Sequence, residues 1–493
     1  MASLEEIRDA RLKKIDLLQE AGMDPYPASV PKDMSLKEAV LNFETLEKDN
    51  RPISLTGRIM AIRGQGAIQF IVLQEGQDQF QAVLKKDEID EKSFALFQDA
   101  VDMGDIISVT GSLFVTKRGQ QSLLIASWQM ASKSLRPLPE KWHGLADQDT
   151  KYRQRYLEII SDSSVYERFL LRSKIVKAVR EYMENQLNFI EIETPILQNQ
   201  AGGAMADVFH THHNALDQDM VLRIALELDH KILMVAGYDR IYEIGKIFRN
   251  EGMDPTHLQE FTMIEWYAAW ATLEENLQWT EDMIKSIVRD VTKQAEVTVL
   301  DKEGNEHTVD LLAPWQRVQF GDLIRENADL DMNTASLEEI KAKASEWGMP
   351  DEDIATTGRA NLLDFVYKKS ARVNIIQPTF VMGYPSDLKP LAKPNDDGTA
   401  QVAQLVVAGA EITNQYGELI NPITQRKLLE DQAAAKAAGD VEAMDIDERF
   451  LTAMEHGMPP MTGFGMGVDR LVALLTEQRT LRDVIFFPMV KNK

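Results

Sequence analysis

The sequence predicts an α+β protein of more than one domain, in which a small N-terminal β-barrel precedes a larger domain built on an antiparallel sheet. The chain has 493 residues, which is longer than most single domains. Apolar residues follow a helical spacing at the N-terminus, a period of two from about residue 52, and a mixture of both patterns after residue 151. With 44% hydrophobic and 27% charged residues, the composition is that of an ordinary globular protein.

Residues 1–51 are expected to form a helical extension. Charged and apolar residues alternate at helical spacing from Glu5 to Ala21, and Gly22 followed by Pro25 ends the helix. Residues 52–140 are expected to form the barrel, because five short period-two segments lie there between Gly, Gln and Asp turns: 53–59, 68–73, 79–84, 106–111 and 122–126. A helical segment at 91–99 falls after the third strand, which is the layout of an OB-type barrel.

A polar stretch from Leu135 to Asp149 that contains proline predicts a linker, which we place at 141–160, and residues 161–493 are expected to form the larger domain. A long amphipathic helix at 166–186 precedes a strand at 189–197, which is ended by a proline. A mainly helical insertion is expected at about 272–375. No Gly-x-Gly-x-x-Gly or Walker-type loop follows a strand, which favours an antiparallel sheet over a nucleotide-binding parallel one.

The bulk composition restricts the kinds of protein this can be. The absence of cysteine excludes disulfides, cysteine-ligated zinc and thiol catalysis. No run of eighteen apolar residues exists, so we expect no membrane span. The polar, acidic N-terminus has no signal segment, so we expect a cytoplasmic protein. A net charge of −24 means that a nucleic-acid partner would need a locally basic face.

Two separate segments each place an arginine beside an expected strand end. One is the charged loop from Phe248 to Glu251, which contains Arg249, and the other is the glycine-rich strand-to-helix junction from Gly463 to Arg470. A guanidinium offers a planar fork to phosphate oxygens, so two arginines directed at one site suit a polyanion such as ATP.

Three segments, taken together, resemble the three signature motifs of class II aminoacyl-tRNA synthetases: the strand ending at Pro195, the loop at 248–251 and the junction at 463–470. A finer resemblance, to the lysyl-tRNA synthetase family, covers nearly the whole chain and includes Thr211 to Leu216 and Arg223 to Ala225. The resemblance implies an anticodon-binding OB-fold, a class II catalytic domain and a homodimer formed through the first motif.

The same resemblance implies how ATP is bound. Arg249 would clamp the α-phosphate and the amino-acid carboxylate, and Glu251 would accept from the adenine amino group. Phe261 would stack on adenine, His257 would contact the triphosphate and Arg470 would bind the γ-phosphate. Arg249, Glu251 and Arg470 are therefore the expected catalytic residues, since in-line attack on the α-phosphate needs positioning and charge neutralisation rather than a strong base.

The expected amino-acid pocket is rich in carboxylates. Asn414, Tyr416 and Glu418 are spaced by two, so they point to one face of a strand, and Glu265 and Tyr267 can join them from a second strand. Two carboxylates and a tyrosine form a charge-assisted cage for the ammonium of lysine. By resemblance, Glu227 with the backbone at Gly203 would bind the α-amino group.

Magnesium is the expected cofactor, because the family holds Mg²⁺ between two acids and the ATP phosphates, in line with its preference for oxygen ligands. Glu411, which also belongs to the expected ATP site, matches one acid. Gln404 stands at the other position, and Val402 stands where the family has arginine. A neutral amide oxygen can bind Mg²⁺, with less charge than a carboxylate.

In the barrel, Arg63, Phe70 and Gln81 match the anticodon-reading positions of the family. An aromatic ring can stack on a base and the two polar side chains can bond base edges. The alternation of Phe70 with Ile71 and Leu73 leaves open whether Phe70 faces solvent or the barrel core.

The resemblance thus implies ATP-dependent ligation of L-lysine to its tRNA through lysyl-adenylate, with release of AMP and diphosphate. One alternative is an aspartyl- or asparaginyl-tRNA synthetase, although Glu418 and Glu265 would repel an acidic side chain. Another is a lysyl-transferring paralogue that modifies an elongation factor, which lacks the N-terminal barrel. A third is a non-catalytic RNA-binding relative, which Gln404 favours and the two arginines oppose.

Overall fold

The structure is a computed structural model that describes residues 3–64, 66–139, 145, 147–204, 206–301, 304–437 and 446–491, with side chains left out at 435–437. It divides into two compact units, Met1–Tyr166 with Val490–Lys493 and Glu167–Met489. Each unit is treated by itself. Part of the expected linker, residues 141–144 and 146, lies outside the described residues.

The N-terminal helices of the first unit are α1 (Leu4–Glu20), α2 (Leu36–Leu41) and α3 (Phe43–Asp49). Helices α1 and α2 both begin at a serine whose side chain accepts from the backbone N–H three residues later, while the glutamate at that position returns the contact. These capping boxes satisfy donors that a helix start otherwise leaves unpaired, so the sequence fixes where both helices begin.

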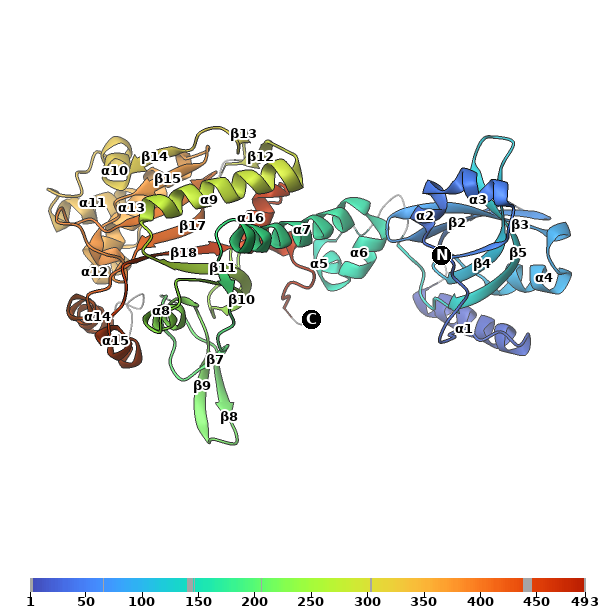
Figure 1. Ribbon diagram of the computed structural model, residues 1–493, viewed down its shortest axis with the longest axis horizontal. Coiled ribbons are helices and arrows are strands. Elements are labelled where there is room, and N and C mark those ends of the chain that lie inside the picture. Colours follow the sequence, from blue (N-terminus) through green and yellow to red (C-terminus); the bar gives the residue numbers. More distant parts are fainter. Residues whose placement is uncertain are drawn as a thin grey trace. The chain divides into compact units, whose positions relative to one another are not determined.

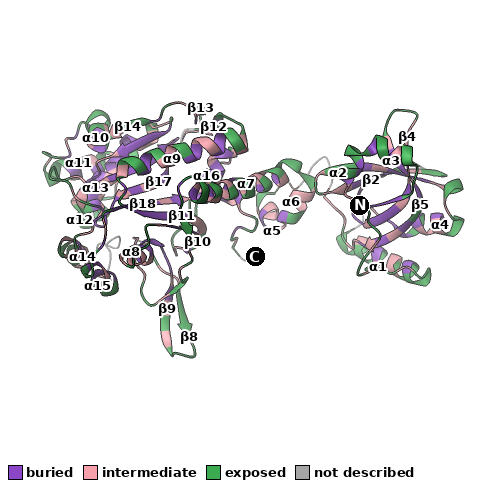
Figure 2. Ribbon diagram, viewed as in Figure 1, coloured by how far each residue is buried: buried purple, intermediate pink, exposed green. Residues whose placement is uncertain are grey.

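The five expected barrel strands are present, and they form a closed barrel in the order β1-β2-β3-β5-β4. Their bounds are β1 (Ile53–Arg63), β2 (Ile68–Glu75), β3 (Asp78–Lys85), β4 (Ile106–Val115) and β5 (Gln121–Ser132), with α4 (Glu91–Ala100) after the third. Alternate side chains such as Ile71 and Leu73 fill the interior. The barrel strands carry many buried residues, drawn in purple in Figure 2. The predicted OB-type barrel is therefore confirmed.

The first unit ends in helices rather than in extended chain. The second half of the expected linker contains α5 (Gln148–Arg153) and α6 (Arg155–Ser161). The long helix α7 (Ser163–Asn185) follows them along the chain.

The second unit is built on an eight-stranded sheet in the order β14-β15-β16-β17-β18-β11-β10-β6 (Figure 1). Its strands are β6 (Ile190–Glu191), β10 (Arg240–Phe248), β11 (Glu260–Ala269), β14 (Gln316–Gln319), β15 (Thr379–Met382), β16 (Val402–Val407), β17 (Ala410–Gly417) and β18 (Met461–Gly467). Neighbours are antiparallel except at the outermost pairs, β14 with β15 and β10 with β6. The predicted antiparallel sheet is confirmed in its centre.

One face of this sheet packs on α7, α9 (Leu273–Ile287) and α16 (Val468–Leu475), with a large apolar core between them. Within that core the rings of Trp266 and Phe464 stack, with their centroids 3.4 Å apart. This packing fixes β11 against β18, the two strands that carry the middle of the site described below.

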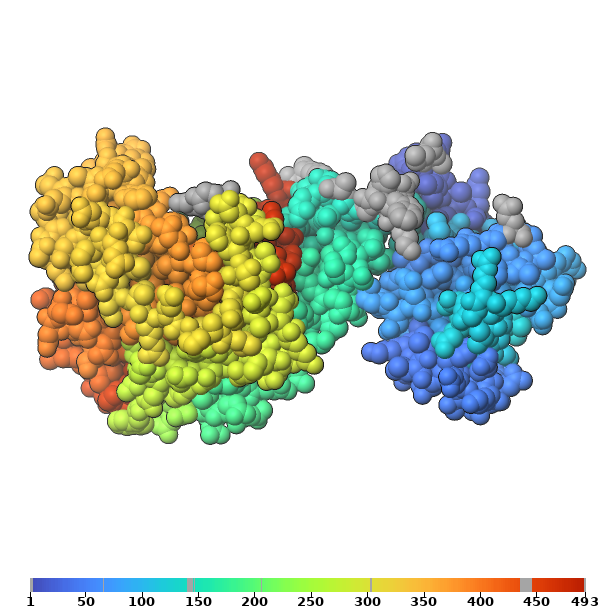
Figure 3. Space-filling view, turned by 90° about the horizontal axis from the view of Figure 1, so that it is seen from above, coloured from blue at the N-terminus to red at the C-terminus, as the bar shows by residue number. Residues whose placement is uncertain are grey.

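The region expected to be a helical insertion contains α9, α10 (Phe320–Ala328), α11 (Leu337–Glu346), α12 (Asp351–Thr356) and α13 (Arg359–Ser370). It also holds strand β14 and the hairpin of β12 (Glu296–Leu300) with β13 (Glu306–Asp310). Figure 3 shows these residues in yellow, covering much of the seen face of the second unit.

The expected strand at 189–197 is split in two. Its start is β6, whereas its end belongs to a separate three-stranded sheet of β7 (Leu197–Gln198), β9 (Gln218–Leu222) and β8 (His210–His213), which projects from the unit (Figure 1). Between them the backbone N–H of Thr194 donates to the Glu243 side chain at 3.0 Å, and Pro195 has no N–H to give to a sheet. The continuous strand was therefore a wrong prediction.

The remaining helices flank the site. They are α8 (Glu227–Val235), α14 (Pro422–Ala437) and α15 (Glu448–Glu455). Among the described residues, no helix is both long and apolar enough to span a membrane.

Candidate functional site

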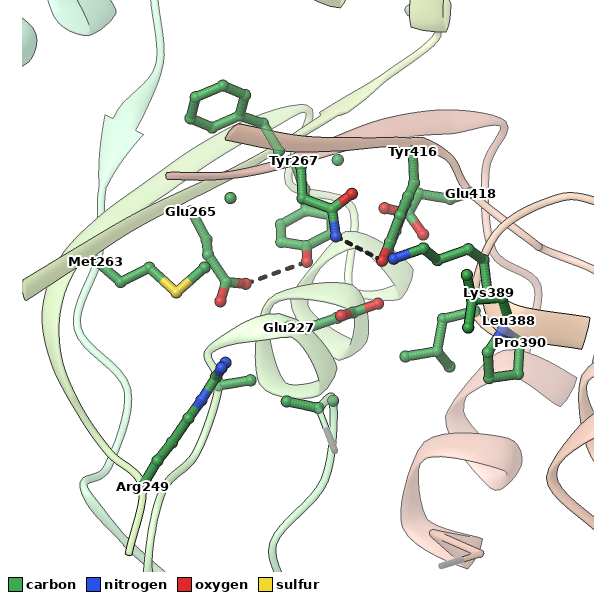
Figure 4. Close-up of a pocket in the computed structure, with 18 residues that line it drawn as sticks. Glu227, Arg249, Met263, Glu265, Tyr267, Leu388, Lys389, Pro390, Tyr416 and Glu418 are labelled. Carbon is green, nitrogen blue, oxygen red and sulfur yellow. Dashed lines mark hydrogen bonds between the residues drawn. The ribbon is translucent and has the colours of Figure 1, made fainter. Parts of the chain in front are cut away.

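A cavity of about 220 Å³ lies in the second unit, bordered by α8, β11, β17 and β18 (Figure 4). All the residues expected to bind the amino acid line it, together with the motif arginine: Gly203, Glu227, Arg249, Glu265, Tyr267, Asn414, Tyr416 and Glu418. These residues come from segments more than 200 positions apart in the sequence. The fold therefore brings together the set that the sequence patterns predicted.

Strand register explains why the cavity exists. Strand β18 lies between β11 and β17, so that Gly465 pairs with both Glu265 and Asn414, and Gly463 pairs with both Tyr267 and Tyr416. A Cβ atom at Gly463 would overlap the Glu418 carboxylate and the Tyr267 ring. The glycines of the third motif thus leave the space into which the polar side chains of the neighbouring strands project.

Three carboxylates surround this space, from Glu227, Glu265 and Glu418, and each of these residues is buried. Glu265 accepts hydrogen bonds from the Leu226 backbone N–H at 3.1 Å and from the Tyr267 hydroxyl at 3.2 Å. Burial, followed by the charge of Glu227, raises the pKa of Glu265 to about 8. A cation placed beside this carboxyl would favour its ionised form.

Lys231 is a further charged residue, behind the cavity wall, which the sequence patterns did not predict. Its ammonium is fully buried, 2.6 Å from Glu227 Oε1 and 2.6 Å from Glu418 Oε2. Burial raises the pKa of Glu418 to about 8, against the opposing effect of Lys231. The spacing of Glu227 and Lys231 by four residues was the available signal, since such pairs meet on one face of a helix.

The nucleotide-binding residues expected from the second motif lie where β10 turns into β11. The Arg249 guanidinium lies 5.3 Å from the centre of the Phe261 ring and makes only long contacts, 3.4 Å, with the Ile224 carbonyl. Glu251 is exposed. His257 is also exposed, and its Nδ1 lies 2.7 Å from the Asp254 carboxylate.

Arg470 lies at the start of α16, and its Nη1 donates to the Glu411 carbonyl at 2.9 Å. The preceding residue, Asp469, is held by Arg172 at 2.6 Å and by the Thr262 backbone N–H at 2.8 Å. These contacts join α7, β11 and α16, so they orient the third motif against the second.

The two expected metal ligands differ in what they can offer. The Gln404 amide oxygen is buried and accepts from the Tyr384 hydroxyl at 2.6 Å, and that hydroxyl also contacts Tyr367 at 3.3 Å. No cluster of three or more acidic, His or Cys side chains suited to a metal occurs within the described ranges. One carboxylate, Glu411, suits a magnesium ion carried by ATP phosphates, whereas an ion held between two protein acids does not fit.

In the barrel, Arg63 pairs directly with Phe70 across β1 and β2, so their side chains share one face. Phe70 is exposed, while Ile71 and Leu73 are buried in the barrel interior. The question left open by the alternation is thereby answered: Phe70 faces outward. Gln81, on β3, donates to Ser122 at 2.7 Å.

Comparison with known proteins matches both parts of the chain to families. The family described as tRNA synthetases class II (D, K and N) matches residues 147–491, and the OB-fold nucleic acid binding domain matches residues 53–131. A lysine--tRNA ligase of Nostoc sp. is 41% identical over 99% of this chain and 88% of its own length. Those of Listeria monocytogenes and Carboxydothermus hydrogenoformans are 40% identical over 99% of both chains.

The chain belongs to the lysine--tRNA ligase family of class II tRNA synthetases. Within this synthetase family, the cavity beside Arg249 is the candidate site for amino-acid activation. Besides Lys231, the patterns missed Tyr384, which contacts Gln404 of β16 from the segment that follows β15, a position that leaves no periodic signal.

Proposed function

We propose that this synthetase ligates L-lysine to tRNA(Lys) in two steps, forming lysyl-adenylate from lysine and ATP and then transferring the lysyl group, with release of diphosphate and AMP. The observation that carries the proposal is the buried cavity in which three carboxylates surround a space next to Arg249. Such a cavity suits a substrate with two ammonium groups and one carboxylate.

In this proposal the amino acid lies with its side chain toward β17. Glu418 and Glu265 accept from its ε-ammonium, and Tyr267, Tyr416 and Asn414 complete that end. The oxygen Oε1 of Glu418 is buried and has no hydrogen-bond partner within the described part of the chain. An unsatisfied buried acceptor is costly, so an incoming ammonium is its natural partner. The Glu227 carboxylate and the backbone at Gly203 accept hydrogen bonds from the α-ammonium group.

Arg249 then holds the substrate carboxylate against the α-phosphate of ATP. The Phe261 ring, whose centre lies 5.3 Å from this guanidinium, stacks on adenine. Glu251 accepts from the adenine amino group, while His257 and Arg470 bind the triphosphate. The carboxylate oxygen attacks the α-phosphorus and diphosphate leaves, so the protein supplies position and charge rather than a base.

We propose Glu411 as the protein group nearest the ATP-bound Mg²⁺, without Gln404, whose amide oxygen already accepts from Tyr384. The ion, when bound, neutralises charge on the phosphates.

The test of the function is pyrophosphate exchange with lysine, aspartate and asparagine in turn. Lysine should drive exchange best, because buried carboxylates repel an acidic side chain. Exchange driven best by aspartate or asparagine would refute the lysine assignment, and no exchange with any of them would favour the non-catalytic alternative.

We propose that residues 52–140 bind the anticodon through the outer face of the barrel, with Phe70 stacking on a base and Arg63 and Gln81 bonding base edges. The exposed ring of Phe70 beside Arg63 supports this. Phe70→Ala should raise the KM for tRNA in aminoacylation and leave pyrophosphate exchange unchanged.

We further propose a homodimer that acts in the cytoplasm. Apolar side chains of the first motif, Ile190, Ile196 and Leu197, are exposed in the single chain, and a second copy would cover them. Sedimentation at micromolar concentration should give twice the chain mass, and a monomer would contradict the proposal.

A further inference from the structure

Lys231 is a buried ammonium behind the wall of the lysine cavity. It is fully buried on α8, with its Nζ 5.9 Å from the centre of the Phe450 ring. An isolated buried charge is very unfavourable, so the ammonium depends on the carboxylates of Glu227 and Glu418 at 2.6 Å each.

Both of these carboxylates also line the cavity. In Glu418 the two oxygens have different environments. Oε2 lies 2.6 Å from the Lys231 ammonium in an ion pair, whereas Oε1 lies outside that pair, and neither oxygen accepts a hydrogen bond within the described residues. Lys231 therefore determines which oxygen of Glu418 remains for a ligand, without itself being among the residues that line the cavity in the described part of the structure.

We propose that Lys231 is a positioning residue for substrate lysine: as an internal counter-ion it holds the Glu227 and Glu418 carboxylates in place at the cavity. This inference rests on the proposed function. It adds a determinant of amino-acid affinity that lies behind the cavity wall.

The electrostatics of the site agree with this role. Burial lowers the pKa of Lys231, but Glu227 and Glu418 outweigh that effect, and the pKa of Lys231 is raised. Removing the ammonium would leave the burial of Glu418 without its main opposing charge, so this carboxyl would become harder to ionise. The other ionisable groups around the cavity are Glu265 and Tyr267 on β11, Tyr416 on β17, His230 on α8, and Arg249 and Lys389 from loops.

The experiment compares lysine and ATP affinity, by calorimetry, in the full-length wild type and the Lys231→Met and Lys231→Arg variants. Lys231→Met should weaken lysine binding roughly 100-fold at neutral pH, because a buried charge pair loses one partner. ATP affinity should stay within about threefold, and Lys231→Arg should recover part of the lysine affinity.

Lys285→Met is the matched control. Lys285 on α9 also pairs with a glutamate four residues earlier, Glu281, at 2.6 Å, and lies 5.8 Å from the centre of the Trp315 ring. It lies outside the cavity, so this variant should bind lysine as the wild type does.

A double substitution keeps the inference testable if Lys231→Met folds poorly. Lys231→Met with Glu418→Gln removes both charges of the pair and should bind lysine no more weakly than Glu418→Gln alone. The inference is overturned if Lys231→Met binds lysine within about threefold of wild type, or if lysine and ATP affinities fall equally. Failure of the proposed function would show separately, as a wild type without lysine-driven exchange.

Discussion

The two ends of the candidate site are constructed differently. At the lysine end the carboxylates are buried, and each has a fixed partner from the protein: Lys231 for Glu227 and Glu418, and Tyr267 for Glu265. At the proposed nucleotide end Glu251 and His257 are exposed on a loop, and the Arg249 guanidinium donates to the Ile224 carbonyl over a long distance, 3.4 Å.

In the proposed function, this difference separates selection of the amino acid from binding of ATP. A pocket whose polar groups are already held in place loses little freedom when its ligand enters, and it rejects ligands that leave those groups unpaired. A loop whose contacts are internal must be ordered by its ligand. We therefore expect lysine-end substitutions to change affinity for one amino acid, and nucleotide-end substitutions to change ATP binding and the chemical step.

The largest effect is expected at Arg249, which belongs to both ends. Arg249→Ala removes the cation shared by the lysine carboxylate and the α-phosphate, and pyrophosphate exchange should fall by about 10³-fold. Binding of tRNA, measured by filter retention, should be unchanged, because the substituted side chain lies in the amino-acid cavity. Exchange at more than a tenth of the wild-type rate would mean that the second motif has been assigned wrongly.

Glu418→Gln should have the next largest effect, and it is confined to the lysine end. The substitution removes a charge but keeps the side-chain volume, so lysine affinity should fall roughly 100-fold while ATP affinity is retained. Calorimetry with lysine and with ATP in turn measures the two affinities separately. Glu281→Gln, which breaks the ion pair with Lys285 on α9, serves as the control. Equal losses for lysine and ATP would contradict the division between the two ends.

Sequence reasoning predicted that Asn414, Tyr416 and Glu418 lie together, and all three line the cavity. Asn414 and Tyr416 alternate along β17 and Glu418 follows its last residue, and a period of two on a strand determines which side chains share a face. The barrel was predicted for the same reason, since its interior residues alternate with outward ones such as Phe70.

What could not be predicted depends on contacts between segments distant in sequence. A Glu–Lys pair four residues apart normally indicates an exposed helix face, so Lys231 gave no sign that Glu418 would bury it. The apolar pattern at 189–197 predicted one strand ended by a proline, but the Glu243 side chain accepts from the Thr194 N–H that a strand would use. Local pattern does not report such competition for a donor.

Lysine affinity should also depend on pH. Burial and then Glu227 raise the pKa of Glu265 to about 8, so below that pH the empty pocket holds this carboxyl protonated. The substrate ammonium favours the ionised form. Affinity should therefore increase by about tenfold per pH unit up to about pH 8 and then level off.

The raised pKa of Glu265 also determines how the stability of the empty protein depends on pH. A carboxyl with a raised pKa stabilises the empty protein fully below its ordinary pKa, and that contribution is lost as the pH rises toward about 8. Lysine should offset the loss. Calorimetry in buffers of different ionisation enthalpy, with melting curves at each pH, tests both statements, and an affinity that is flat from pH 6 to 8 would contradict them.

The smallest effect is expected in the nucleotide loop. The Asp254 carboxylate accepts from the Thr256 N–H at 2.6 Å and lies 2.7 Å from His257 Nδ1. Although partial burial opposes it, bonds from Thr256 and His257 lower the pKa of Asp254 to about 2, so it is negative at neutral pH beside the proposed triphosphate contact. Asp254→Asn keeps an acceptor for the turn but removes this charge.

ATP affinity should then increase by about two- to fivefold, the usual size of an exposed charge interaction, while lysine affinity is unchanged. The gain should diminish between about 50 and 300 mM salt, because screening weakens repulsion between exposed charges. Weaker ATP binding in the variant would show that Asp254 orients His257 for the phosphates. In that case the nucleotide end would be organised before ATP arrives, and the contrast with the lysine end would be smaller than the structure indicates.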